Sequence, residues 1–292
     1  MTQHEKGLTY ILVAAILMSL DAVFIRLSGL HGFAPSFLFG VFSLISMTLL
    51  TRITEGNLLA VMKNGGFMLL VSGAIMGVSG TAFTLAVQKT TVANVLLIMS
   101  ITPILSAIFS WIFLKERLQR QTLYAILLSM IGIFVIVKGS LATGGLVGDL
   151  IALVCSLAVS ANFIVWRKYK HLNRSLVVGA GGLFIALFAT PFIHVGQFDR
   201  HGILVMMVMG LFTAPVGRMF NAMATRMISA PEVSLISQIK IVIAPVIIWA
   251  IFSEIPSQET YIGGSLILIA ALGQPLFKLY QIKRQPAPTI AE

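Results

Sequence analysis

The segment ANVLLIMSITPILSAIFSWIFLKERL, residues 93–118, carries no charged residue before Lys115. An apolar run of about 20 residues can cross the roughly 30 Å hydrocarbon core of a bilayer as an α-helix. Similar runs recur along all 292 residues, of which 58% are hydrophobic and 10% charged, with a mean hydropathy of +0.97. Soluble domains carry about 25% charged residues. The sequence therefore predicts an all-α, polytopic membrane protein.

Ten runs have the length and hydropathy of membrane-spanning helices. We expect these spans over residues 8–27, 33–52, 66–87, 91–114, 121–139, 147–166, 175–196, 202–225, 231–252 and 260–280. The connections between them are short, and residues 285–292 are expected to form a disordered tail. The single cysteine, Cys155, lies inside a run, which excludes an internal disulfide.

Basic residues are distributed unequally between the two sides of the membrane that these spans imply. With the N-terminus inside, 14 Lys and Arg residues fall on the inner side and four on the outer side. Because Lys and Arg favour cytoplasmic loops, this bias predicts that both termini are cytoplasmic. It also accounts for the net charge of +10 without a nucleic-acid partner. We expect a multi-pass protein of the cell inner (plasma) membrane, surrounded by lipid, that does not require an oligomer.

The chain contains a repeat with an offset of 138 residues, which aligns residues 93–118 with PEVSLISQIKIVIAPVIIWAIFSEIP at 231–256. Three identities in this register are Trp111 with Trp249, Glu116 with Glu254 and Thr122 with Thr260. The first half, 1–140, and the second, 141–284, each hold five expected spans. Because five is odd, the halves lie in opposite orientations. Inverted repeats are typical of secondary transporters, whose substrate site lies near the midplane between the repeats.

The ten spans, the five-plus-five inverted repeat and three segments together resemble the drug/metabolite transporter superfamily, EamA family. The segments are FTLAVQKTTVANVLLI at 83–98, TPILSAIFSWIFLKERL at 102–118 and APVIIWAIFSEIP at 244–256. The resemblance covers about residues 8–280 and implies transport of a small metabolite. Asp21 and the FSEIP motif are most similar to a subgroup with S-adenosylmethionine uptake carriers and organic-anion carriers. Lys240 replaces an acidic residue of that uptake carrier, which weakens the case for a cationic substrate.

The candidates for charges deep within expected spans are Asp21, Arg218 and Lys240, the last inside LISQIKIVIAPV at 235–246. A charge at the membrane centre costs about 2.5–3.5 kcal/mol on insertion scales, so each should face a cavity or a partner. One carboxylate cannot neutralise two cations. The set therefore favours a substrate with an anionic group, such as an organic anion, an amino acid or another zwitterion. The alternatives are a structural ion pair and protonation of Lys240 or Asp21 that couples transport to a proton gradient.

Other residues are weaker candidates for the site. The polar residues within spans are Gln88, Asn94, Asn162, Asn221, Gln238 and Gln274, which either line a cavity or join helices through hydrogen bonds. The prolines within spans are Pro103, Pro215 and Pro245, which act either as hinges or as static kinks. Glu116 and Glu254 lie at loop edges, where we expect solvated charges rather than gating contacts. Gly73 and Gly77 form a GxxxG match suited to close helix packing.

An intramembrane enzyme and a channel are the alternative classes. Asp21 is the only carboxylate that we expect within the membrane, which argues against aspartyl chemistry. A channel would show a re-entrant filter or rings of like residues, and the sequence has neither pattern. The histidines are scattered and no phosphate-binding glycine loop is present, so we expect no metal, cofactor or ATP dependence. Within the family, an amino-acid or drug exporter and an S-adenosylmethionine-type importer remain alternatives, with protons or a counter-substrate as candidate coupling partners.

Overall fold

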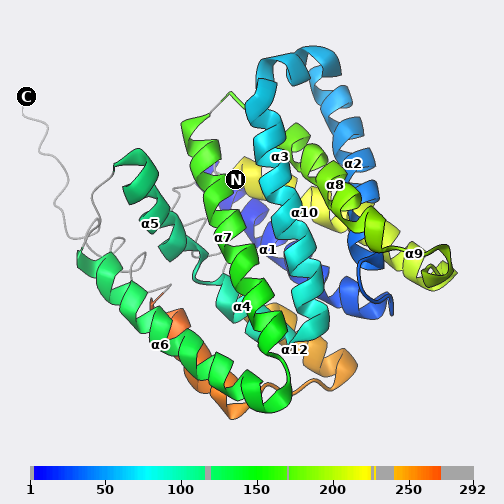
Figure 1. Cartoon of the computed structure of the whole chain (residues 1–292). Coiled ribbons are helices and arrows are strands. Elements are labelled where there is room, and N and C mark those ends of the chain that lie inside the picture. The colour runs from blue at the N-terminus through cyan, green and yellow to red at the C-terminus, as the bar shows by residue number, and fades with distance from the viewer. Residues whose placement is uncertain (1–2, 116–119, 170, 225–226, 228–239, 271–292) are drawn as a thin grey trace, which may run out of the picture.

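The computed structural model describes residues 3–115, 120–169, 171–224, 227 and 240–270. In these ranges the chain forms a bundle of helices, with no strand (Figure 1). The α-helices in these ranges include α1 Gln3–Leu27, α2 Ala34–Glu55, α3 Leu58–Lys89, α4 Val92–Met99, α5 Thr102–Leu114, α6 Arg120–Thr143, α7 Leu146–Lys168, α8 Arg174–Ala189, α9 Arg200–Val208, α10 Ala214–Ala224 and α12 Lys240–Phe252. Shorter elements are the 3₁₀ turns η1 Thr190–Phe192 and η2 Val195–Gln197 and the π-helix η3 Met209–Thr213. A further helix covers 258–270.

Seven helical segments in the described residues are long and apolar enough to cross a membrane. They correspond to the expected spans at 8–27, 33–52, 66–87, 91–114, 147–166, 175–196 and 202–225. Two shorter apolar helices, Leu127–Gly139 and Ile243–Phe252, fall in the expected fifth and ninth spans. The helix at 258–270 begins the expected tenth. The rest of the expected tenth span, residues 231–239 of the expected ninth span and the expected disordered tail at 285–292 lie outside the described residues.

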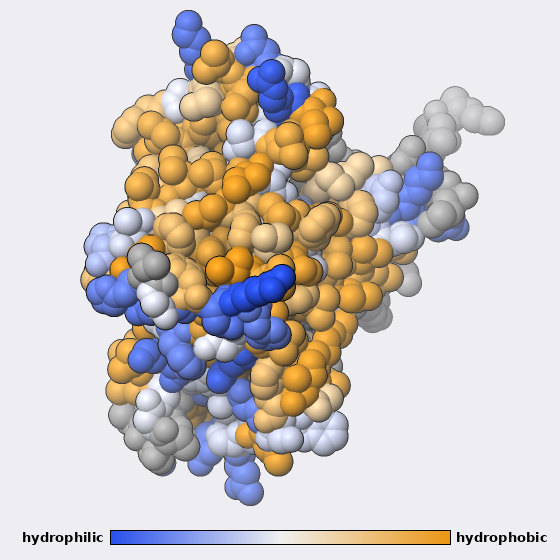
Figure 2. Space-filling view, turned by 90° about the vertical axis from the view of Figure 1, so that its right-hand side faces the viewer, coloured by the Kyte–Doolittle hydropathy of each residue, from blue (hydrophilic) through white to orange (hydrophobic). Residues whose placement is uncertain are grey.

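The outer surface of the bundle is apolar. Figure 2 shows hydrophobic residues over most of the face in view. On α6, the side chains of Tyr124, Met130 and Phe134 are 62–72% exposed. Soluble monomers rarely expose large contiguous apolar patches, whereas a helix in lipid must present such a face.

Two helix crossings depend on glycines that let backbones touch. Gly40 of α2 meets Gly182 of α8, and a Cβ on Gly40 would lie 2.6 Å from the Gly182 carbonyl oxygen. Gly132 of α6 meets Gly263 in the same way. The GxxxG residues of α3 also pack within the chain, against Ala180 and Phe184 of α8. Small residues at such crossings are typical of membrane helices, which gain stability from close packing.

The long helices pack in a regular set of pairs. α2 lies along α8, and α3 lies between α8 and α7 (Figure 1). α1 packs against α10 and α12, while α4 and α5 pack against α7. The largest buried cluster runs through these contacts and includes Ile25, Phe39, Ile98 and Ile185. Helices from the first and second parts of the chain therefore interleave instead of forming two separate lobes.

Candidate functional site

Asp21 of α1 and Arg218 of α10 form a buried pair of opposite charges. The Asp21 side chain is 7% exposed and that of Arg218 is 25% exposed. Arg218 Nη1 lies 3.9 Å from Asp21 Oδ2, and the guanidinium also lies over the Phe39 ring, 5.5 Å from its centroid. Charge-assisted hydrogen bonds measure about 2.7–2.9 Å, so the two groups attract without a hydrogen bond. Among the described residues, Asp21 Oδ1 and Arg218 Nη1 have no hydrogen-bond partner.

Lys240 joins this pair from a third helix. It is the first described residue of α12 and is partly buried. The charges of Asp21 and Arg218 both act on its ammonium group. The three intramembrane charges singled out from the sequence are therefore brought together from α1, α10 and α12. One carboxylate and two cations leave this group with an excess of positive charge.

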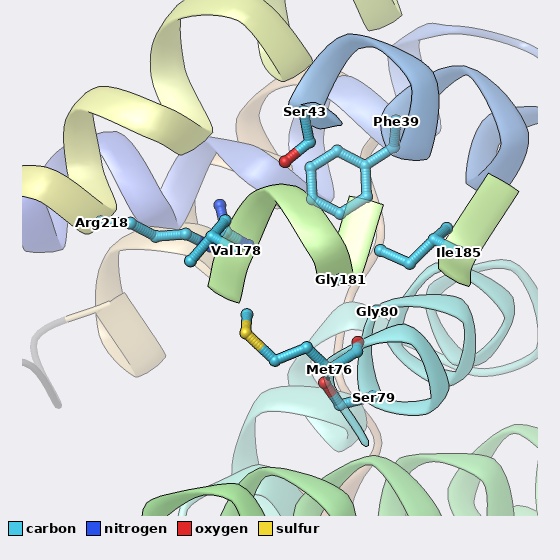
Figure 3. A pocket seen from close by; sticks show the side chains of 9 residues that line it. All are labelled: Phe39, Ser43, Met76, Ser79, Gly80, Val178, Gly181, Ile185 and Arg218. Carbon is cyan, nitrogen blue, oxygen red and sulfur yellow. Dashed lines mark hydrogen bonds between the residues drawn. The ribbon is translucent and has the colours of Figure 1, made fainter. Parts of the chain in front are cut away.

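A small pocket, which we call the central pocket, adjoins the Arg218 side chain. Its lining residues are Phe39 and Ser43 of α2, Met76, Ser79 and Gly80 of α3, Val178, Gly181 and Ile185 of α8, and Arg218. In Figure 3, Arg218 reaches past Val178, while Ser43 and Ser79 approach from the two neighbouring helices. The pocket volume is about 40 Å³. Water needs about 10–15 Å³ on this scale, so the space suits a few waters at most, and a metabolite would require the helices to separate.

Asn162 and Gln88 make hydrogen bonds that join helices and loops. Ser72 of α3 donates to Asn162 Oδ1 of α7, and Trp166 Nε1 donates to Ser72 Oγ at 2.9 Å. Gln88 Nε2 donates to the carbonyl of Gly32 at 3.0 Å. Neither residue lines the central pocket. The Asn221 side chain, Gln238 and Gln274 lie outside the described residues.

A second polar group occupies the end of the bundle where α1, α3 and α12 finish. We call it the end cluster, and it consists of Arg26, Thr90, Asn94, Asp149, Glu254 and Thr260. Glu254 Oε1 accepts the backbone N–H of Val92 at 2.9 Å, and Oε2 lies 3.3 Å from Arg26 Nη2. Arg26 Nη2 also donates to the Thr90 carbonyl at 2.8 Å. The expectation of a solvated loop charge at Glu254 was wrong, because this carboxylate pairs with an arginine and caps the start of α4. Glu116 lies outside the described residues.

The other half of the end cluster centres on Asn94 and Asp149. Thr260 Oγ1 donates to Asn94 Oδ1 at 2.7 Å, and Thr90 Oγ1 donates to Asp149 Oδ1 at 2.7 Å. Asn94 Nδ2 lies 3.4 Å from both Thr90 Oγ1 and Asp149 Oδ1. Asp149 is fully buried. Asp21 is therefore not the only carboxylate inside the bundle, which corrects the expectation from sequence. Asp149 stands in the first turn of α7, a place where a solvated acid is common, so only its distant partners reveal its burial.

Two predicted hinge prolines coincide with irregular helix geometry. The span at 91–114 breaks at Ser100 and Ile101, between α4 and α5, with Pro103 in the first turn of α5. Pro103 cannot bond the Met99 carbonyl four residues back, and Thr102 Oγ1 donates to that oxygen at 2.6 Å. Ser160 of α7 donates to the Thr102 carbonyl at 3.1 Å. These hydroxyls satisfy backbone groups that lipid could not.

Pro215 follows a similar arrangement in the second part of the chain. It is the second residue of α10, which follows the π-helix η3, and the carbonyl four residues earlier belongs to Leu211. Ser46 of α2 donates to that carbonyl at 3.0 Å. Pro245, in contrast, lies inside α12 without a break. The hinge role of all three prolines stays a prediction.

The fold and this buried charged group define an integral membrane protein of helical bundle type. The chain belongs to the EamA-like transporter family, whose model matches residues 5–138 and again residues 146–273. This confirms the family indicated by the sequence motifs. The protein is thus a transporter by family, with a small-molecule cargo.

Several similar proteins agree with this assignment. An uncharacterized transporter of Clostridium kluyveri is 23% identical over 290 residues, covering 92% of this chain and 92% of its own length. The uncharacterized transporter YyaM of Bacillus subtilis is 24% identical over 259 residues, covering 82% and 84%. The pseudopaline exporter CntI of Pseudomonas aeruginosa is 26% identical over 220 residues, covering 73% and 76%. One crystal structure shares the fold, with a TM-score of 0.65 at 18% identity, and the match covers 94% of this chain and 98% of that one.

Proposed function

We propose that this chain is a secondary active transporter for a small metabolite with an anionic group, zwitterions included, working by alternating access. One observation carries the proposal. Arg218 is a partly buried cation that lines the central pocket, and its buried Nη1 atom has no hydrogen-bond partner among the described residues. A buried unpaired donor costs about 1–3 kcal/mol, and more if charged, so a ligand oxygen there would recover that energy.

The charge arrangement supports the substrate class. A guanidinium suits a carboxylate or phosphate because it can offer two parallel N–H groups. Asp21 lies beside it and offers an unpartnered oxygen to an ammonium group. Lys240 adds a second positive charge to the same region. A purely structural Asp21–Arg218 pair is the competing account, and the 3.9 Å separation without a hydrogen bond argues against it.

The proposal includes ten spans arranged as two inverted halves, 1–140 and 141–284. The family model matches twice, once within each half. In the proposed repeat, the third span corresponds to the eighth and the first span to the sixth. A contact between the third and sixth spans therefore predicts an equivalent contact between the eighth and first spans. Both contacts occur, as α3 with α7 and α10 with α1. The central pocket is lined by α2 and α3 from one half and by α8 and α10 from the other.

We further propose that the protein lies in the inner membrane with both termini in the cytoplasm, following the 14-to-4 bias of basic residues. Reporter fusions after Gln285 and within residues 254–259 test this arrangement. The first should report a cytoplasmic location and the second an external one. Finding both reporters on one side would contradict the inverted halves.

Counterflow in proteoliposomes tests the transport proposal. A thermal-shift screen of purified protein with leucine, glutamate, succinate and S-adenosylmethionine, and with putrescine as a compound that has no anionic group, would select compounds for flux measurements. A carrier predicts saturable uptake that is accelerated by unlabelled substrate on the opposite side, whereas a channel predicts neither. Measuring flux in both directions, with and without a proton gradient, separates uptake from export, the direction named for the relative CntI. Binding confined to compounds without an anionic group would overturn the substrate class.

A further inference from the structure

The side-chain contacts of the end cluster that link different helices also join the two proposed halves, apart from the bonds of Arg26 and Asn94 to Thr90. Glu254 bonds to Arg26 and to the Val92 backbone, Thr260 bonds to Asn94, and Asp149 bonds to Thr90 and Asn94. In each contact one residue comes from the first half and the other from the second. A motion of one half against the other must therefore break these bonds.

The end cluster also lies close to the central pocket along shared helices. Arg26 follows Asp21 on α1 by five residues, and Thr90 ends α3, the helix that carries Ser79. At 1.5 Å per residue, Arg26 lies about 7 Å along the axis from Asp21, and Thr90 about 16 Å from Ser79. The end cluster thus stands between the central charges and one end of the bundle.

We propose that the end cluster is a closed gate on the external side of the pathway, with the Arg26–Glu254 ion pair as its electrostatic latch and Asn94 with Asp149 as its buried hub. The inference rests on the proposed alternating-access function. Opening toward the outside requires Glu254 to release both Arg26 and the first turn of α4. Hydrogen bonds of Asn94 to Thr260 and Asp149 join α4 to the first turns of two further helices, the helix at 258–270 and α7, so the latch and the hub open together.

A cysteine reporter in the central pocket tests the gate without any knowledge of the substrate. Ser79→Cys in a Cys155→Ala background puts one thiol in the pocket lining. The measurement is the rate at which a charged, membrane-impermeant methanethiosulfonate added from outside modifies this thiol in right-side-out vesicles. We expect Glu254→Gln to raise the rate about 10-fold, because it loses the ion pair yet keeps an acceptor for the Val92 N–H. Glu254→Ala, which loses both contacts, should raise it further.

Lys89→Gln is the matched control, since it removes an exposed charge at the end of α3 that takes no part in the side-chain contacts of the end cluster. Its modification rate should equal that of the reporter protein alone. Unchanged rates in folded Glu254→Gln and Glu254→Ala would overturn the gate. If the Glu254 variants do not fold, Thr260→Val decides the matter in the same way, because it deletes the bonds of Thr260 Oγ1 to Asn94 and Ser257 and leaves Glu254 in place. A raised rate in a protein that transports none of the tested compounds would keep the gate and refute the substrate proposal instead.

Discussion

The end cluster and the central pair use similar residues in opposite ways. At the end of the bundle, Arg26 and Glu254 are joined by an ion pair at 3.3 Å and by hydrogen bonds to backbone groups. At the centre, Arg218 and Asp21 approach only to 3.9 Å, and one polar atom of each has no hydrogen-bond partner in the described structure. Arg26 Nε likewise has none, so the contrast rests on the geometry of the two ion pairs. Buried charges are strongly stabilised only where geometry and hydrogen bonds are good. We propose that the first group holds helices together and that the second is arranged for a ligand.

Neutralising the central pair should have the largest effect on function. The double variant Asp21→Asn/Arg218→Gln removes both charges of the pair together, so neither is left without the other. We expect folded protein with counterflow reduced about 100-fold, because the substrate loses its main electrostatic partner. The measurement is initial counterflow rate at equal protein content, with melting temperature in detergent as the control. Normal transport by the double variant would make the pair structural.

Lys240→Gln should have a smaller effect at the same site. Lys240 acts on the pair electrostatically, and it makes no hydrogen bond or ion pair with the described residues. We expect about a 10-fold loss of substrate affinity with little change in melting temperature, corresponding to about 1.4 kcal/mol. The charge swap Asp21→Lys/Lys240→Asp should not restore transport, since Arg218 is the ion-pair partner of Asp21. Full recovery in the swap would instead identify Lys240 as the structural partner of Asp21.

Asp149→Ala should have the opposite balance of effects. It should lower the stability of the protein more than it weakens substrate binding. It leaves the Thr90 hydroxyl and the Asn94 amide without their shared acceptor, at a cost of about 1–3 kcal/mol. We expect a lower melting temperature in detergent and, at a temperature where the protein is folded, an unchanged substrate affinity. An affinity loss without destabilisation would place Asp149 in the binding site and remove the contrast between the two groups.

Ser46→Ala should have the smallest effect. It removes the hydroxyl that donates to the Leu211 carbonyl, the group left open by Pro215. Hydrogen bonds between membrane helices contribute about 0.6 kcal/mol on average, so a loss of that order in unfolding free energy is expected. If Pro215 also acts as a hinge, Pro215→Ala should slow transport more than it reduces folded yield. Unchanged flux in Pro215→Ala would identify a static kink.

Local sequence patterns predicted much of the fold. Apolar runs identified the spanning helices because lipid imposes a minimum length on each of them. The rarity of ionisable residues in such runs singled out Asp21, Arg218 and Lys240, which the structure brings together. The kink in α3 at Gly66, where φ is 52°, was not predicted, because the expected span began at residue 66 whereas α3 begins at Leu58.

The end cluster could not be predicted because its contacts join residues far apart in the chain. Arg26 and Glu254 are separated by more than 200 positions, and each stands at a helix end where a solvated charge is the ordinary case. Asp149 gave the same local signal as any acid in the first turn of a helix. Asn94 resembled a cavity-lining residue, yet its partners come from α3, α7 and the helix at 258–270.

Equilibrium binding of the substrate to Arg218→Lys tests the central claim most directly. Lysine keeps the positive charge next to Asp21 but loses the planar pair of donors that a carboxylate or phosphate can use. Arg200→Lys, at an exposed arginine, is the matched control. The account predicts folded protein with at least about 10-fold weaker binding for Arg218→Lys and unchanged binding for the control. Unchanged affinity in Arg218→Lys would contradict a direct role of the guanidinium in holding the substrate.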